Sequence, residues 1–362
     1  FPVLSGGAAI NRRFGRRILR TESGDTYAAG VFYCKDAFEG LAVMDTLSDP
    51  QQRTAALEAV QRESDMEFNR AAAEAAVPAG APRRAQVAPA VVIPRPPIWG
   101  PRVVRDMPLE MVMQHLSKNE LFRLSWGAKN THCPAWEKLQ AEYEERLDRM
   151  RKQAVQEGWL RPQAVYGYWP AQADGDDLVV FEPGSVASGS PAEIQRFQFP
   201  RQLNGEFLCL SDYFLPLGAP QMDVVAFQVV TVGLEATQRF DRLQEAGDYS
   251  EAYFTHGLAV QTAEATAEYL HRHILRELGL PLEQGKRYSW GYPAIPELPD
   301  HAKVFELLPA ESELGMSLTS AHQFVPEQST AAIIVHHPAA KYFNIGESRV
   351  DQLMRSAAGG QS

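Results

Sequence analysis

The sequence has few cysteines, and they are widely separated. Its 362 residues include Cys34, Cys133 and Cys209, too few and too scattered for a disulfide framework or a four-cysteine zinc site. This cysteine usage fits a reducing compartment, so a cytoplasmic location is expected.

Long apolar runs and excess positive charge are also missing. The longest apolar candidate, residues 222–234, is shorter than the ~18 residues of a membrane span and contains Asp223 and Gln228. The first ten residues lack the basic segment and apolar core of a signal peptide. A formal net charge of -10 disfavours broad binding to a polyphosphate backbone. We therefore expect neither a membrane nor a nucleic acid as partner.

The remaining composition is that of a globular chain, with 45% hydrophobic and 22% charged residues. Short apolar runs at residues 1–4 and 30–34 alternate with helical stretches at 11–19 and 37–47. That order is typical of a parallel α/β sheet, but about fifty residues are too few for a complete doubly wound domain. We expect residues 1–52 to be the last β-α units of such a domain, and the chain to be the C-terminal part of a longer protein.

Residues 53–97 predict a connecting segment. Large apolar side chains are sparse in the first part, so a mostly solvated helix is expected there. Six prolines follow, and prolines favour an extended linker because they fix φ and remove backbone donors. They are Pro78, Pro82, Pro89, Pro94, Pro96 and Pro97. The sequence thus predicts a domain boundary near residues 78–96.

Residues 98–350 mix helical and strand patterns, and residues 351–362 form a tail. Apolar residues from Trp136 to Ala154 are spaced 3, 4, 4, 3 and 4 apart, which predicts a helix. A longer helix is expected over 249–278. Strands are expected over 178–181, 206–210, 224–232 and 331–336. The pattern predicts an α+β domain with an antiparallel sheet and long helices.

Glu264, Glu268 and His271 fall on one stripe of the longer helix. Carboxylates four residues apart repel, so an ordinary helix usually alternates charge signs there. Solvated ion pairs with Arg272 and Arg276 are the alternative explanation. Small residues flank the carboxylates and permit close approach of another backbone, namely Ala263, Ala265 and Ala267.

Two further segments carry polar and aromatic groups. Residues 284–296 predict a loop rich in glycine, proline and aromatic rings, with Arg287 at its head. Backbone amides beside flat rings suit a purine, and an arginine suits a carboxylate, although a purely structural loop is the alternative. In residues 336–343, His336 and His337 are adjacent on a strand and would point to opposite faces, as would His271 and His273 on the helix. A protein-ligated metal is not expected.

The ordered set of motifs resembles the reactivation domain of the cobalamin-dependent methionine synthase family. The main motifs are Glu-Ala-Thr-Ala-Glu-Tyr-Leu-His at 264–271, Gly-Tyr-Pro-Ala-x-Pro at 291–296 and His-Pro-x-x-Lys-Tyr at 337–342. Others are Leu-Phe-Arg at 121–123 with Trp-Gly at 126–127, Trp-Pro-Ala at 169–171 and Gly-Met-x-Leu-Thr at 315–319. Pro-Val-Leu-x-Gly-Gly-Ala at 2–8 and Tyr-x-x-Asp-Ala at 33–37 are similar to the end of the family's Rossmann-like cobalamin-binding domain. Each motif is weak alone, whereas their order and spacing are specific.

The resemblance implies a multi-module enzyme of methionine biosynthesis. The family moves a methyl group from methyltetrahydrofolate to cob(I)alamin and then to homocysteine. Its C-terminal domain binds S-adenosylmethionine and, with an electron from flavodoxin or a flavin reductase, converts inactive cob(II)alamin back to methylcobalamin. Implied partners are the cobalamin-binding and substrate modules of the same polypeptide, with zinc confined to modules absent from this chain.

Site roles follow from the same resemblance. Arg287 would hold the carboxylate of S-adenosylmethionine, and Glu264 would face its cationic end. Backbone groups of Ser289 and Gly291 would contact adenine or ribose, with Gly291 permitting close approach. The domain would mainly position the methyl donor, so no catalytic acid or base is expected.

Other assignments are implied more loosely. Tyr342 would contact the ligand with Phe343 beside it, and Tyr292 would lie near the corrin. An expected early-domain aspartate is replaced, with Glu110 as the candidate replacement. Ser289 stands where alanine is familiar and Phe343 where a tyrosine is familiar, so one hydroxyl is lost.

Cobalamin contacts in this chain would be only a remnant. The resemblance assigns Gly6 and Ala37 to the nucleotide tail of the cofactor. The chain contains no Asp-x-His-x-x-Gly, the motif that supplies the lower axial histidine, so its methylcobalamin site is incomplete.

Two other functions remain open at this point. One is a non-catalytic docking module whose acidic surface recruits a flavodoxin-like reductant. The other is a generic α/β nucleotide-binding enzyme, which is disfavoured because Gly6-Gly7-Ala8 lacks the Gly-x-Gly-x-x-Gly spacing.

Overall fold

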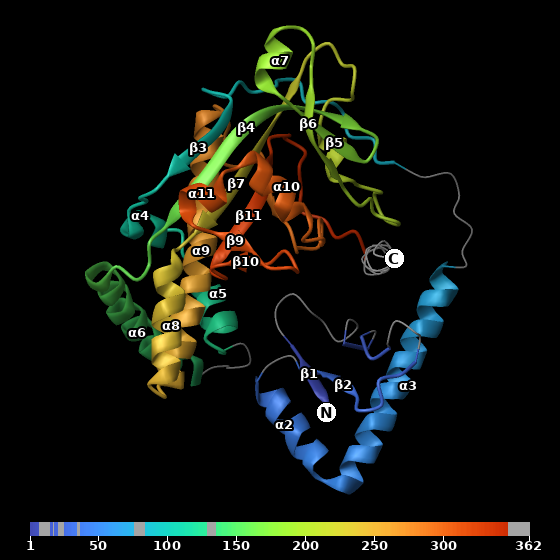
Figure 1. Cartoon of the computed structure of the whole chain (residues 1–362), viewed down its shortest axis with the longest axis vertical. Coiled ribbons are helices and arrows are strands. Elements are labelled where there is room, and N and C mark those ends of the chain that lie inside the picture. The colour runs from blue at the N-terminus through green and yellow to red at the C-terminus, as the bar shows by residue number, and fades with distance from the viewer. Residues whose placement is uncertain are drawn as a thin grey trace. The chain divides into compact units, whose positions relative to one another are not determined.

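The computed structural model describes residues 1–6, 15–16, 18–20, 25–34, 37–75, 84–128 and 135–346, except for the side chains of 37, 38 and 67–75. The chain divides into two compact units, residues 1–83 with 350–362 and residues 84–349 (Figure 1). The predicted tail and most of the predicted helix at 11–19 lie outside the described residues.

The first unit contains the predicted parallel strand pair. Strands β1 (Val3–Ser5) and β2 (Val31–Tyr33) pair in parallel. Helices α2 (Ala37–Ser48) and α3 (Pro50–Ala75) follow and pack together. Glu63 of α3 forms an ion pair with Arg16 at 2.9 Å, so α3 belongs to this unit.

The second unit is built on a seven-stranded antiparallel sheet, which confirms the predicted α+β class. Its strand order is β6-β5-β4-β7-β11-β8, and β3 pairs with β4. The strands are β3 (Gly100–Val104), β4 (Gln163–Asp174), β5 (Asp177–Phe181), β6 (Glu193–Gln198), β7 (Asp223–Thr231), β8 (Lys286–Ser289) and β11 (Ser329–Val335). A separate small pair is β9 (Ser317–Leu318) with β10 (Phe324–Val325).

The central strand β7 separates two apolar cores. All nine of its residues are buried, which explains its nearly continuous apolar sequence. Phe227 and Val229 face one core, while Ala226 and Val230 face the other. The alternation places helix α9 on one face of the sheet and the core that contains Trp290 on the opposite face.

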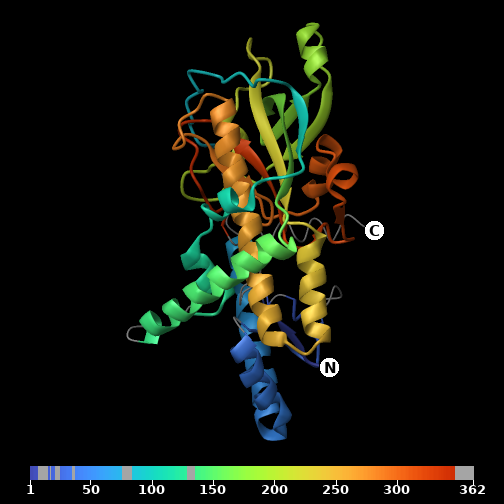
Figure 2. The same cartoon turned by 90° about the vertical axis from the view of Figure 1, so that its left-hand side faces the viewer.

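The long helix α9 (Tyr249–Glu277) covers the second face and agrees with the predicted helix (Figure 2). Asp248 caps it by accepting a hydrogen bond from the amide of Glu251 at 3.1 Å. Gln228 of β7 donates to the carbonyl of Ala267 at 3.2 Å, so the small residues of α9 do allow a close approach to the sheet. The other helices are α4 (Leu109–Met113), α5 (Lys118–Glu120), the π-helical turn η1 (Leu121–Ser125), α6 (Ala135–Glu157), α7 (Pro183–Ala187), the 3-10 turn η2 (Leu210–Tyr213), α8 (Leu234–Glu245), α10 (Asp300–Leu307) and α11 (Ala310–Leu314).

Two local predictions are wrong. Residues 206–210 are not a strand, because Gln202 and Asp212 side chains accept the amides of Leu208 and Cys209 and turn the chain into η2. Residues 286–289 are not a loop but strand β8, an edge strand whose lysine and arginine hide its apolar alternation.

The segment before β3 packs on the second unit. The amide of Ala85 donates to Phe207 at 3.3 Å, and His337 Nε2 donates to the carbonyl of Ala88 at 2.9 Å. Arg84 forms an ion pair with Asp176 at 3.3 Å. These contacts attach residues 84–88, within the proline-rich stretch, to the sheet domain.

None of the helices among the described residues combines the length and the apolar character that crossing a membrane requires. Within the same residues, no group of three or more His, Cys, Asp and Glu side chains could hold a metal ion.

Candidate functional site

The register of β8 determines which side chains reach helix α9. Arg287 lies opposite Ile334 of β11, and Tyr288 lies opposite Ile333. Ile334 belongs to the core beneath α9, whereas Ile333 belongs to the core on the other face. Neighbouring strand residues alternate faces, so Arg287 points toward α9 and Tyr288 away from it.

Two of the predicted site residues converge on the carboxylate of a third, Glu264. Arg287 Nη2 donates to Glu264 Oε2 at 3.1 Å, and the hydroxyl of Tyr292 donates to Glu264 Oε1 at 3.0 Å. They come from a strand, a helix and a loop, and Glu264 and Arg287 lie 23 positions apart in the chain. The structure thus assembles Glu264, Arg287 and Tyr292 into one polar cluster.

Arg287 keeps an unused donor in this cluster. Its side chain is 15% exposed, and its buried Nη1 has no hydrogen-bond partner among the described residues. A buried unpaired guanidinium nitrogen costs free energy. A ligand carboxylate is the group that a guanidinium binds best, so the spare donor fits such a ligand.

Tyr292 is held as a neutral hydrogen-bond donor. Desolvation of the phenol and the neighbouring Glu264 carboxylate raise the pKa of Tyr292 well above its usual range. The hydroxyl, which is protonated at neutral pH in any tyrosine, therefore remains the donor to Glu264 in mildly alkaline solution as well.

Glu268 behaves differently from Glu264, although both lie on one stripe of α9. Arg272 donates to Glu268 at 2.8 Å, and His271 lies 3.7 Å from the same carboxylate. The interactions with His271 and Arg272 lower the pKa of Glu268 to about 2. The alternative of ion pairs within the helix thus holds for Glu268, whereas Glu264 turns to Arg287.

In the glycine turn after β8, the amide of Gly291 forms a hydrogen bond within the turn. Gly291 has φ of +84°, a conformation that favours glycine, and its N–H donates to the carbonyl of Ile295 at 2.9 Å. Ser289 is buried in β8 opposite Ala332. The amide of Gly291 is therefore not a free donor for a ligand.

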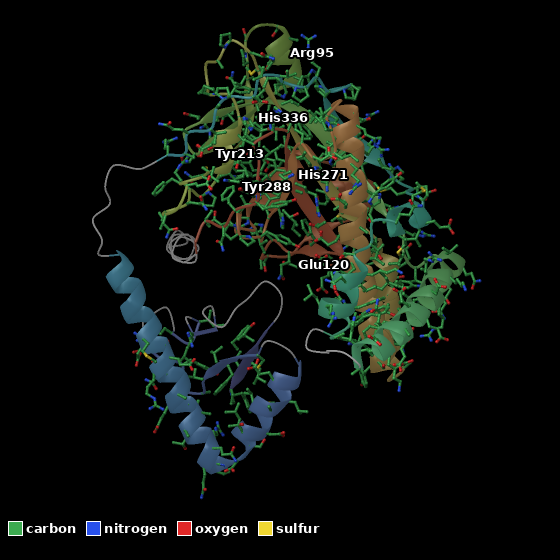
Figure 3. All side chains as sticks on the ribbon, turned by 180° about the vertical axis from the view of Figure 1, so that it is seen from behind. Arg95, Glu120, Tyr213, His271, Tyr288 and His336 are labelled. Atoms are coloured by element: carbon green, nitrogen blue, oxygen red, sulfur yellow. The ribbon has the colours of Figure 1, made fainter. Side chains whose placement is uncertain are left out.

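Tyr288, for which no role was predicted, holds the segment that carries the predicted aromatic pair. Its hydroxyl donates to the carbonyl of Lys341 at 2.7 Å. Its ring lies 5.5 Å from that of Tyr342 and 6.2 Å from that of Phe343. Tyr342 is 68% exposed, so buried Tyr288, which Figure 3 labels, fixes an aromatic ring at the surface.

The adjacent histidines serve the fold. Buried His336 donates through Nε2 to Asp223 at 2.5 Å, and His337 bonds to Ala88. Burial lowers the pKa of His337. These contacts tie the end of β11 to β7 and to the segment before β3.

The remaining predicted residues are not part of the cluster. Glu110 is exposed in the first turn of α4 and makes no hydrogen bond or ion pair with other described residues. Gly6 follows β1, where an added Cβ would lie 2.4 Å from the carbonyl oxygen of Cys34, and Ala37 begins α2. Close backbone packing thus accounts for Gly6. The assignment of Gly6 and Ala37 to the nucleotide tail of cobalamin stays a prediction.

Comparison with known proteins adds independent information. Residues 137–358 match the family model described as vitamin B12 dependent methionine synthase, activation domain. Methionine synthase of Mycobacterium tuberculosis is 34% identical over 389 residues, covering 95% of this chain and 32% of the relative. That of Mycobacterium leprae is 33% identical over 394 residues, with the same coverages of 95% and 32%. The chain thus spans about a third of the length of these relatives.

A solved structure shares the fold. The crystal structure of the MetH reactivation domain bound to AdoHcy matches with a TM-score of 0.64 and 25% sequence identity. The match covers 74% of this chain and 88% of that one.

Proposed function

The chain belongs to the family of vitamin B12-dependent methionine synthase activation domains, and from this we propose that residues 84–346 bind S-adenosylmethionine for the reductive remethylation of cob(II)alamin. The observation that carries the proposal is the unpaired buried nitrogen of Arg287 beside the carboxylate of Glu264. The AdoHcy-bound relative supports the same ligand class.

The chemistry of the ligand matches the groups of the cluster. S-adenosylmethionine carries a carboxylate, an ammonium and a sulfonium. Nη1 of Arg287 would bind the carboxylate, and Glu264 would attract the cationic end. Tyr342, exposed beside β8, would contact the adenosyl portion, with Phe343 packed behind it. The chain would thereby orient a methyl donor, a contribution of positioning rather than acid–base chemistry.

The proposal extends to the longer enzyme of which such a chain is a part. Methyl transfer from methyltetrahydrofolate to homocysteine, with cobalamin and zinc, would belong to other modules of the same polypeptide. Flavodoxin or a flavin reductase would supply the electron, in the cytoplasm.

Calorimetric titration of the full chain with S-adenosylmethionine tests the binding function. We expect binding by the unsubstituted chain and a loss of about 10- to 100-fold in Arg287→Gln, the range for a charged hydrogen bond. Arg242→Gln, which removes an exposed arginine from α8, is the matched control and should leave affinity unchanged. If the unsubstituted chain gives no heat with this ligand, the binding function is rejected in favour of a docking module.

A further inference from the structure

Glu120 carries an exposed carboxylate that has no assigned role. It is the last residue of α5 and immediately precedes η1. Its side chain makes no ion pair or hydrogen bond within the described part of the chain. An unpaired carboxylate is available to interact with a cation from solution.

Contacts between η1 and α9 place Glu120 at the level of the candidate site. Trp126 Nε1 donates to the carbonyl of Phe254 at 3.1 Å, and Gln261 Nε2 donates to Ser125 Oγ at 3.1 Å. The two segments therefore run in opposite directions, so earlier residues of η1 lie beside later residues of α9. Glu264 lies one turn beyond Gln261 on α9. The start of η1, which follows Glu120, lies beside this turn.

Electrostatics agree with this placement. Desolvation and Glu264 are the main causes of the raised pKa of Tyr292, and the negative charge of Glu120 adds to them. The carboxylate of Glu120, which Figure 3 labels, thus lies close enough to Tyr292, the hydrogen-bond donor to Glu264, to influence its proton.

The remaining charges of the site cancel one another. Arg287 offsets Glu264, and Arg272 offsets Glu268. S-adenosylmethionine carries one negative and two positive charges at neutral pH, whereas its demethylated product, S-adenosylhomocysteine, has lost the sulfonium and is neutral overall. Because Glu264 and Glu268 are already paired, one additional negative charge near the sulfonium would favour the methyl donor over its demethylated product.

We propose that Glu120 supplies this charge, facing the sulfonium, and that it makes the site prefer S-adenosylmethionine over S-adenosylhomocysteine. The inference rests on the proposed function. Glu120 acts across a solvated distance, so its effect should be moderate and should weaken as salt screens it.

The experiment compares both ligands on the full chain, on Glu120→Gln and on Glu245→Gln. Glu245, which is exposed at the end of α8 and unpaired among the described residues, is the matched control. Dissociation constants are measured by calorimetry at low and at physiological ionic strength. For Glu120→Gln we expect a loss of about 3- to 10-fold for S-adenosylmethionine at low salt, and less at higher salt. S-adenosylhomocysteine should lose less than about twofold, because it lacks the sulfonium charge.

The possible outcomes separate the two proposals. An equal loss for both ligands, or no loss for either, overturns the role of Glu120 while leaving the binding function intact. A loss of the same size in Glu245→Gln also overturns it, because the effect would then be one of net charge. If the unsubstituted chain binds neither ligand, the proposed function itself fails, and the role of Glu120 fails with it.

Discussion

Among the individual side chains, the two glutamates on one stripe of α9 have different partners and different roles. Glu264 is bonded to Arg287 and Tyr292, from a strand and a loop, whereas Glu268 is bonded within its own helix. We expect Glu264→Ala to weaken S-adenosylmethionine binding by about tenfold or more, the cost of a lost charged contact. Glu268→Ala should cost less than about threefold, since its partners lie on the helix surface.

Equilibrium dialysis with labelled S-adenosylmethionine measures the affinity of both variants, and thermal unfolding shows whether each is folded. Equal losses, or a larger loss in Glu268→Ala, would contradict the assigned roles.

The sequence could predict the charged members of the site but not their supporting residues. Glu264 and Arg287 stand out as a carboxylate in a like-charged stripe and an arginine heading a glycine-rich segment. Tyr288 and Glu120 do not stand out, because their positions depend on the register of β8 with β11 and on the packing of η1 against α9. Such long-range pairings leave no local periodicity.

Among the elements, α9 was predictable from the sequence, whereas strand β4 was not. The helix is long, capped by Asp248 and ended by Gly279, so its signals are local. Strand β4 contains Gly167 and Pro170, which argue against a strand when read locally, yet it pairs with three neighbours. The sheet imposes this strand through tertiary pairing, which outweighs its weak propensity.

The approach of α9 to the sheet yields a prediction about stability. Ala267 is fully buried, and its carbonyl accepts the side chain of Gln228. Ala267→Leu would force three additional heavy atoms into this contact, and overpacking of that kind costs about 1–3 kcal/mol. We expect the melting temperature to fall by roughly 2–10 °C.

Differential scanning calorimetry measures this change, with Ala141→Leu on the exposed face of α6 as the control. If the two variants melt alike, the close packing of α9 is not a major source of stability.

Across the whole molecule, the two compact units make the second one a candidate for independent folding. Glu264, Arg287 and Tyr342 all lie in the second unit, as do the apolar cores on both faces of its sheet. A fragment of residues 84–349 should therefore fold cooperatively and bind S-adenosylmethionine within about twofold of the full chain, because it retains all contacts of the site.

The residue at which that fragment starts should determine its stability and its affinity for the ligand. Composition alone suggested a domain beginning at residue 98. In the structure, however, Arg84 forms an ion pair with Asp176, and Ala85 bonds to Phe207. Ala88 accepts a hydrogen bond from His337, and Val87 packs on the core that contains Phe227. A fragment of residues 98–349 would leave His337 Nε2 without its acceptor beside the segment that carries Tyr342. We expect this fragment to unfold at a lower urea concentration and to bind more weakly than residues 84–349. Equal unfolding midpoints and affinities for the two fragments would show that residues 84–97 are only a linker, and that the domain is complete without them.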